Sequence, residues 1–159
     1  MARRLDLHDW DALPATAARG PGWALARGDS LELLEKLPPH SVDLVFADPP
    51  YHLSNGGSTC QAGRRVSVNK GRWDASHGVA GDHAFQRAWL AACRKVLAPS
   101  GAIWVSGTQH VIFSVGFAMQ ELGFHLLNTV TWYKPNASPN LACRFFTHST
   151  EILLWASPL

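Results

Sequence analysis

The chain has 159 residues, of which 47% are hydrophobic and 16% are charged, and its formal net charge is +2. These values predict one globular domain with a hydrophobic core, and they exclude a disordered chain and a chain of two ordinary domains. The small positive charge permits a nucleic-acid partner without requiring one.

The spacing of cysteine and histidine bears on metals and on compartment. Cys60, Cys93 and Cys143 are widely spaced and odd in number, which predicts reduced thiols rather than a disulfide framework or a zinc site. The eight histidines show no metal-ligand spacing. The first residues lack the apolar stretch of a secretory signal, and no apolar run has the length of a membrane span. We therefore expect a cytoplasmic protein that uses neither a metal nor a membrane.

The first third of the chain predicts two strands and a helix after an irregular start. Residues 1–22, with several prolines and glycines, are expected to form an N-terminal arm. Residues 23–27 predict a short strand, and Ser30 is expected to cap a helix whose leucines repeat at helical spacing until Pro38-Pro39. The compact apolar run 42–47 predicts a buried strand.

The rest of the chain begins with a long polar segment, residues 52–81, which predicts a functional or mobile loop. Asp82 is expected to cap a helix that ends at Pro99-Ser100-Gly101. The elements expected after it are a strand at 102–106, a helix at 110–122, a strand at 124–133, a loop at 135–150 and a strand at 152–156.

Strands that alternate with helices predict an α/β fold with a mainly parallel sheet. The last two strands are joined by a loop alone, which predicts an antiparallel pair at one edge of the sheet. Trp104, Trp132 and Trp155 fall in predicted strands and are expected in the core.

Asp48-Pro49-Pro50-Tyr51 directly follows the apolar run, at the end of a strand where open parallel sheets bind ligands. An exocyclic amine of a nucleobase is a poor nucleophile because its lone pair is delocalised into the ring. Asp48 and the Pro49 carbonyl offer two acceptors for the two amine hydrogens, and Tyr51 offers a ring on which a base can stack. Turn, strand-end and core roles explain each residue singly, but average residue usage places the whole tetrapeptide in roughly one unrelated chain in a thousand.

The tetrapeptide in this setting resembles the catalytic signature of amino-methyltransferases that use S-adenosylmethionine. From about residue 23 onward the chain resembles the β-class DNA adenine-N6 methyltransferases of restriction–modification systems. The matching segments are Gly28–Ser30, Ser54–Gly57, Ser67–Asp74, Val96-Leu97 with Gly101, Thr131–Lys134 and His148–Ala156. Aspartate in the first place of the motif implies adenine-N6, because the cytosine-N4 enzymes usually carry serine there.

The resemblance implies a Rossmann-like methyltransferase sheet and methyl transfer by direct attack on a base that has been flipped out of the duplex. The implied partner is double-stranded DNA, with single-stranded DNA and a homodimer as further suggestions. Glu151, at a strand start, is expected either to orient a basic partner or to be a solvated or capping residue. The implied catalytic residues are Asp48, Pro49, Pro50 and Tyr51; the implied cofactor-binding residues are Asp29, Ser30 and Asp48; and the implied DNA-binding residues are Ser54, Asn55, Lys70, Arg72, Trp73, Lys134 and Asn136.

The family's Phe-x-Gly-x-Gly cofactor loop is absent from the sequence. We therefore expect residues 23–159 to form the catalytic half of the methyltransferase domain, with the first nucleotide-binding strands and the cofactor loop missing. Half a sheet is expected to leave an apolar edge and face exposed. The remainder is expected as a missing C-terminal half or as a complementing chain, and the 159 residues alone are expected to bind S-adenosylmethionine weakly or not at all.

Two alternatives stay open at this point. One is an amino-methyltransferase for cytosine-N4 or for an RNA base. The other is a non-catalytic DNA-binding or assembly fragment that depends on a partner for the cofactor.

Overall fold

The computed structural model describes residues 18–54, 58–62, 64–140 and 143–158. The chain begins with a hairpin of β1 (Ala18–Gly20) and β2 (Trp23–Leu25), which pair antiparallel. Gly22 in the turn has a φ of +78°, which glycine adopts without strain. The expected irregular arm is therefore wrong for Ala18–Gly20, while residues 1–17 lie outside the described residues.

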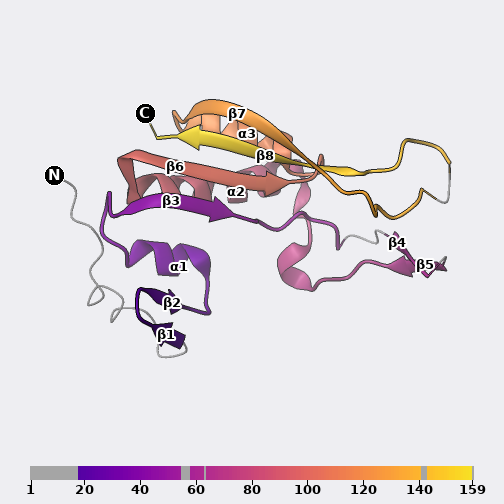
Figure 1. The fold of residues 1–159 in the computed structure, drawn as a ribbon, viewed down its shortest axis with the longest axis horizontal. Coiled ribbons are helices and arrows are strands. Elements are labelled where there is room, and N and C mark those ends of the chain that lie inside the picture. The colour runs from indigo at the N-terminus through magenta and orange to yellow at the C-terminus, as the bar shows by residue number, and fades with distance from the viewer. Residues whose placement is uncertain (1–17, 55–57, 63, 141–142, 159) are drawn as a thin grey trace.

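Four strands form the main sheet in the order β3-β6-β8-β7 (Figure 1). Their bounds are Val42–Ala47 for β3, Leu97–Gly107 for β6, His125–Tyr133 for β7 and Thr150–Ser157 for β8. In the described part of this sheet, β3 and β6 are the only strands that pair in parallel, whereas β8 is antiparallel to both of its neighbours. The expected mainly parallel sheet is thus wrong for the described residues, and the expected antiparallel pair of last strands is confirmed.

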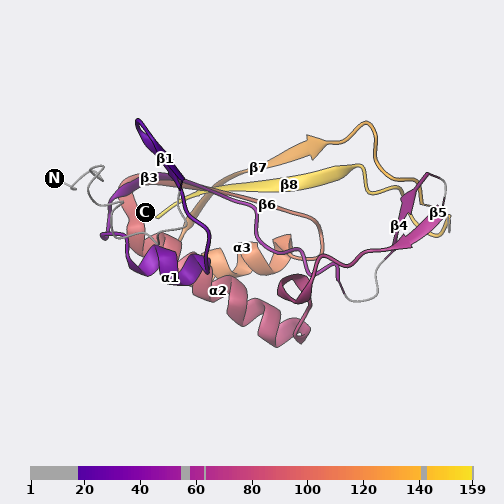
Figure 2. The same ribbon diagram turned by 90° about the horizontal axis from the view of Figure 1, so that it is seen from below.

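Three helices cover one face of this sheet (Figure 2). They are α1 (Ser30–Glu35), α2 (Gly78–Val96) and α3 (Ile112–Glu121). Side chains from α2, α3 and the central strands make the core, and Leu90, Ile103 and Met119 are fully buried there. Apolar residues at helical spacing on α2 therefore meet alternate residues of β6, as amphipathic elements require.

The opposite face of the sheet is apolar and exposed. Leu44 and Phe46 on β3 are 58% and 65% exposed, and Trp132 on β7 is 54% exposed. Trp104 and Trp155 are half-buried and stack on each other with their ring centroids 5.2 Å apart. The expectation of three core tryptophans is therefore wrong, whereas the exposed edge and face that the sequence predicted are present in the described residues.

The starts of two helices differ from the sequence expectation. The cap of α1 is Asp29, not Ser30, because the Asp29 carboxylate accepts a hydrogen bond of 2.8 Å from the Leu31 amide. Helix α2 begins at Gly78, ahead of Asp82, whose carboxylate reaches back to the His77 amide. Asp82 thus supports the helix start from inside the helix.

Strand β6 is longer than expected because it starts at Leu97 and includes Pro99-Ser100-Gly101. The register with β3 shifts at this point, between Val42 and Leu44. A Cβ atom on Gly101 would lie 2.9 Å from the Asp43 carbonyl oxygen, so glycine allows the two backbones to approach. The segment that suggested a helix stop therefore forms the irregular start of a strand.

The expected long loop contains structure of its own. Strands β4 (Ser58–Gln61) and β5 (Arg64–Ser67) pair antiparallel, and the 3-10 helix η2 (Arg72–Asp74) follows. The hairpin extends away from the sheet at the same end as the loop between β7 and β8 (Figures 1 and 2). Among the described residues, no helix is both long enough and apolar enough to cross a membrane.

Candidate active site

Asp48 follows the last residue of β3, at the carboxyl end of the one parallel pair in the described sheet. Ser106 lies near the carboxyl end of the neighbouring strand β6, and its buried side chain reaches Asp48. The position is the crevice where open α/β sheets place their ligands. The sequence placed the motif there correctly, and the partner from β6 was not foreseen.

The Asp48 carboxylate is held through one of its two oxygens. The hydroxyls of Tyr51 and Ser106 each lie 2.6 Å from Asp48 Oδ1. This length is typical of a hydroxyl that donates to an ionised carboxylate. Burial, together with the hydrogen bond to Asp48, raises the pKa of Tyr51 well above its usual value, so Tyr51 stays a protonated donor.

Tyr51 lies next to an ion pair between Lys134 and Glu151. Glu151 on β8 is nearly buried, and its Oε2 lies 3.5 Å from the Tyr51 hydroxyl. Its other oxygen accepts a hydrogen bond from Lys134, whose Nζ also lies 5.2 Å from the centroid of the Trp132 ring. Of the roles expected for Glu151, the structure therefore supports the first, in which Glu151 orients a basic partner, here Lys134.

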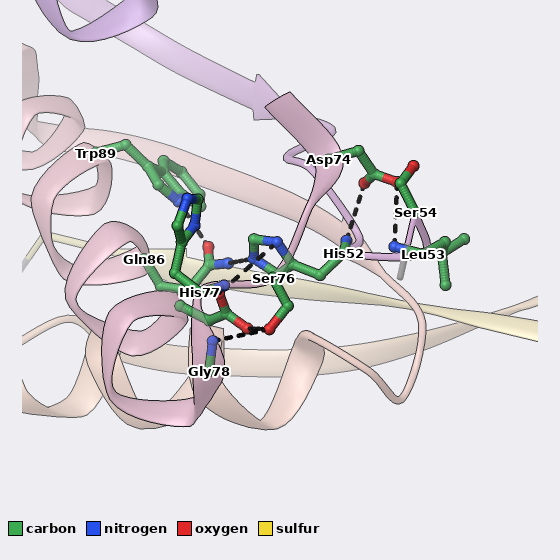
Figure 3. Close-up of polar contacts among 10 residues, drawn as sticks. His52, Leu53, Ser54, Asp74, Ser76, His77, Gly78, Gln86 and Trp89 are labelled. Atoms are coloured by element: carbon green, nitrogen blue, oxygen red, sulfur yellow. Dashed lines mark hydrogen bonds and ion pairs between the residues drawn. The ribbon is translucent and has the colours of Figure 1, made fainter. Parts of the chain in front are cut away.

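A buried aspartate fixes the chain directly after the motif. Asp74 in η2 is 0% exposed and accepts from the His52 amide at 2.9 Å and the Leu53 amide at 3.1 Å (Figure 3). The Ser54 hydroxyl donates to the same carboxylate at 2.8 Å. Burial alone would raise the pKa of Asp74, but these three hydrogen bonds and the nearby Lys70 charge hold it below its usual value.

The Asp74 bonds explain how His52 keeps a left-handed backbone with a φ of +55°. Such a conformation costs about 1–3 kcal/mol in a residue other than glycine, so neighbouring contacts must impose it. The His52 ring also contacts α2, where its Nε2 lies 3.4 Å from the Gln86 amide nitrogen (Figure 3). Gln86 in turn accepts from the Trp89 indole at 2.7 Å. The segment after Tyr51 is thereby attached to both η2 and α2.

A cavity of about 440 Å³ opens beside Asp48, between α1, β3 and α2. Cys93 of α2 lines this cavity. Burial raises the pKa of its thiol to about 12, so the thiol carries no charge at neutral pH. Of the residues expected to bind cofactor, Ser30 and Asp48 line the cavity, and Asp29 instead caps the adjacent helix. The lining residues are Ala26, Ser30, Leu33, Leu34, Leu37, Val45, Ala47, Asp48, Pro49, Pro50, Trp89 and Cys93.

The residues expected to bind DNA differ in their surroundings. Ser54 and Lys134 are engaged within the protein, with Asp74 and Glu151 respectively. Lys70 lies 5.8 Å from the centroid of the Tyr51 ring, beside the motif. The others are Arg72, Trp73 and Asn136, which are exposed, and Asn55, which lies outside the described residues.

Sequence reasoning missed Ser106 and the structural role of Asp74. A usable signal existed for Ser106, because it is a polar residue near the end of an apolar strand next in order to the motif strand. No such signal marked Asp74, which looks like any other acidic residue in a polar loop.

Comparison with known proteins places this geometry in a family. A family model described as DNA methylase, for N6 and N4 methyltransferases, matches residues 42–158. The chain belongs to the N6/N4 DNA methylase family. It is 54% identical over 132 residues to the type II methyltransferase M2.LlaDCHI of Lactococcus lactis subsp. cremoris, covering 83% of this chain and 49% of that one. It is 49% identical to M2.DpnII of Streptococcus pneumoniae, again covering 83% and 49%.

The DNA methylase fold is also found among solved structures. The cytosine-N4-specific PvuII DNA methyltransferase superposes with a TM-score of 0.61 at 21% identity, covering 84% of this chain and 48% of that one. A putative DNA modification methylase of Thermus thermophilus, in complex with S-adenosylmethionine, gives 0.54 at 19% identity, covering 82% and 53%. The expected methyltransferase fold is thus confirmed, and the chain spans about half the length of the curated relatives it matches.

Proposed function

We propose that this chain carries the catalytic half of an S-adenosylmethionine-dependent DNA methyltransferase that modifies N6 of adenine in a restriction–modification system. The observation that carries the proposal is Asp48-Pro49-Pro50-Tyr51 at the carboxyl end of β3, with its carboxylate held by two hydroxyls. Family membership supports the reaction class. Aspartate at the first place of the motif supports adenine over cytosine. We place the activity in the cytoplasm.

The proposed reaction is direct attack by the adenine amine. Asp48 and the Pro49 carbonyl accept the two N–H groups of N6, which orients the nitrogen lone pair and stabilises the positive charge that develops on it. The N6–methyl bond forms as the methyl–sulfur bond breaks, S-adenosylhomocysteine leaves, and the proton left on N6 passes to water. Asp48 need not take that proton before the attack.

The cavity beside Asp48 suits part of the proposed cofactor. Its volume of about 440 Å³ is within the range of small-molecule sites, and its walls are chiefly leucine, alanine, valine and proline side chains. These surfaces fit the apolar faces of an adenosine, with Ser30 and Asp48 as polar groups at the wall. Asp29 lies beside them at the start of α1. When bound, S-adenosylmethionine supplies an activated methyl group on a sulfonium.

The proposed DNA contacts lie beyond the carboxyl ends of β3 and β6, at the same end of the sheet as the motif. Lys70, Arg72 and Trp73 follow the β4–β5 hairpin and directly precede or belong to η2. Asn136 lies in the loop between β7 and β8, which extends beside that hairpin (Figures 1 and 2). Cations and an exposed aromatic ring around a base-binding motif match the chemistry of a DNA backbone and its bases. The duplex is the proposed substrate form.

We also infer that further polypeptide covers the exposed sheet face. Leu44 and Phe46 lie on β3, at one edge of the sheet, and Trp132 lies on β7, at the other edge, and all three are exposed apolar residues. The curated relatives are about twice as long as the segment they share with this chain. The unmatched half of such a protein is the proposed occupant, as part of the same chain or as a separate one, and a second copy of this chain is the competing occupant.

Replacing Asp48 by Ala tests the catalytic assignment. The variant is expected to lose methyl transfer to DNA by about 1,000-fold or more, because the acceptor that orients the amine is gone. The assay is transfer of labelled methyl groups to DNA by the catalytically complete enzyme, meaning this chain together with the polypeptide that completes the domain. Asp43→Ala, at an exposed position near the start of the same strand, is the matched control and should keep its rate. An Asp48→Ala enzyme within a few-fold of the parent would refute the assignment.

A further inference from the structure

Asp48 has two carboxylate oxygens, and the described residues use them unequally. Tyr51 and Ser106 both donate to Oδ1. A carboxylate oxygen offers about two lone-pair sites, so these two hydroxyls fill Oδ1. Oδ2 has no hydrogen-bond partner among the residues that the structure describes. The carboxylate therefore keeps one oxygen available for a further donor.

Ser106 has one hydroxyl proton and two acceptors within reach. The Asp48 oxygen lies at 2.6 Å, and the Ala47 carbonyl oxygen lies at 3.3 Å. The shorter contact has the length of a charge-assisted bond, and the longer one exceeds the usual range for a hydroxyl donor. The proton therefore belongs to the Asp48 bond, and a role confined to the strand backbone would predict the opposite preference.

The support for this arrangement is rigid. Ser106 is 5% exposed and sits in β6 between β3 and β8, so its hydroxyl has little freedom to move. Tyr51 is attached to the chain that Asp74 fixes, and its hydroxyl lies between Asp48, Ser106 and Glu151. Both donors thus come from elements that are held independently of Asp48.

We propose that Ser106 is a positioning residue for methyl transfer: with Tyr51 it occupies Oδ1 of Asp48 and so directs Oδ2 to the amine of the target base. The inference rests on the proposed function, because it assigns a task to the oxygen that faces the substrate. Ser106 acts through Asp48 and does not touch the base. Without its hydroxyl, the carboxylate rotates and shares both oxygens between Tyr51 and the amine.

Three variants of the catalytically complete enzyme test the proposal. Ser106→Ala is expected to lower kcat by about tenfold to a hundredfold, because a misplacement of about 1 Å in a reacting group has effects of that order. The KM values for DNA and for S-adenosylmethionine should stay within about threefold, since substrate binding is not changed. Ser106→Thr keeps the hydroxyl and should restore kcat to within about threefold of the parent.

Ser41→Ala is the matched control, because Ser41 is also buried and its hydroxyl donates to the Pro38 carbonyl at 2.6 Å, far from the motif in the fold. It should lower the Tm as Ser106→Ala does and leave kcat unchanged. If Ser106→Ala keeps the parental kcat, or if Ser106→Thr is as slow as Ser106→Ala at the same Tm, the proposal is wrong. The Asp48→Ala enzyme, assayed in parallel, distinguishes failure of the proposed function from failure of the Ser106 inference. If Asp48→Ala is active, both proposals are wrong. If it is inactive, the Ser106 variants alone decide the Ser106 inference.

Discussion

At the scale of single residues, Asp74 is the side chain outside the motif on which most of the site geometry depends. It is fully buried and joins three consecutive residues that follow Tyr51. A buried carboxylate without partners would be strongly unfavourable, and here the hydrogen bonds to it come from the segment it orders. The free energy of those bonds is therefore also what holds His52 in its left-handed conformation.

The Asp74 bonds predict a pH-dependent stability. The folded pKa is lowered, so the contribution is complete above the unfolded pKa of about 3.9 and is lost as the pH falls through the lower folded value. Asp74→Asn is therefore expected to lower the free energy of unfolding at pH 7 by on the order of 2 kcal/mol, and by less at pH 3. Urea unfolding of both proteins at pH 7, 5 and 3 measures this difference.

The control for this prediction is Asp43→Asn, an exposed aspartate on β3. Its difference from the parent should be small at each pH, since surface substitutions usually change stability within about 0.5 kcal/mol. A difference between the parent and Asp74→Asn that is the same at pH 3 and pH 7 would show that the ionised carboxylate is not what holds the segment.

The catalytic motif was predictable at this scale because four adjacent residues carry its chemistry. Ser106 carried only the weaker signal of a polar residue near the end of the next apolar strand. Both Ser106 and Glu151 meet the motif through strand pairing, 58 and 100 residues away from their partners in the chain. Lys134 was expected near the substrate, and its ion pair with Glu151 depends on the register of β7 with β8. Contacts of this kind follow from the topology and not from local sequence.

At the scale of elements, periodicity and stop signals predicted every strand of the main sheet and its three helices. The errors lie at boundaries, where two local signals compete. Asp29 and Ser30 are both good capping residues, and the backbone selects the first. Pro99-Ser100-Gly101 stops a helix and also suits an irregular strand start, and the close approach to β3 decides for the strand. The β4–β5 hairpin was missed because a polar segment without alternation gives no strand signal.

At the scale of the whole molecule, the exposed sheet face and the cavity lined by α1, β3 and α2 both lead us to expect weak binding of cofactor by this chain alone. The cavity beside Asp48 has apolar walls from α1, β3 and α2, and few polar groups for the charged end of S-adenosylmethionine. Because affinity needs both walls of a crevice, we expect this 159-residue chain alone to bind S-adenosylmethionine with a Kd of about 1 mM or weaker.

Isothermal titration calorimetry of the isolated chain measures that affinity. The control is the same chain mixed with the polypeptide that completes the domain, which should bind more tightly. A micromolar Kd for the chain alone would contradict the inference that the second wall comes from further polypeptide.

The mixed sheet was the main error at this scale. Alternating strands and helices predicted a mainly parallel sheet with one antiparallel pair at its edge, but β8 lies between β6 and β7 and pairs antiparallel with both of them. The uncovered face was predictable, because the absence of a cofactor loop from the sequence implied an incomplete sheet. The tryptophans of this face were wrongly expected in the core, because the sequence of a strand does not indicate which of its two faces will be covered.

The most direct measurement is the identity of the methylated nucleoside. The catalytically complete enzyme is incubated with DNA and S-adenosylmethionine that carries a labelled methyl group, and the DNA is digested to nucleosides for mass spectrometry. We predict labelled N6-methyldeoxyadenosine, and none of it from the Asp48→Ala enzyme. Labelled N4-methyldeoxycytidine, label found only in added RNA, or no labelled nucleoside at all would contradict the assignment of adenine-N6 chemistry to Asp48-Pro49-Pro50-Tyr51.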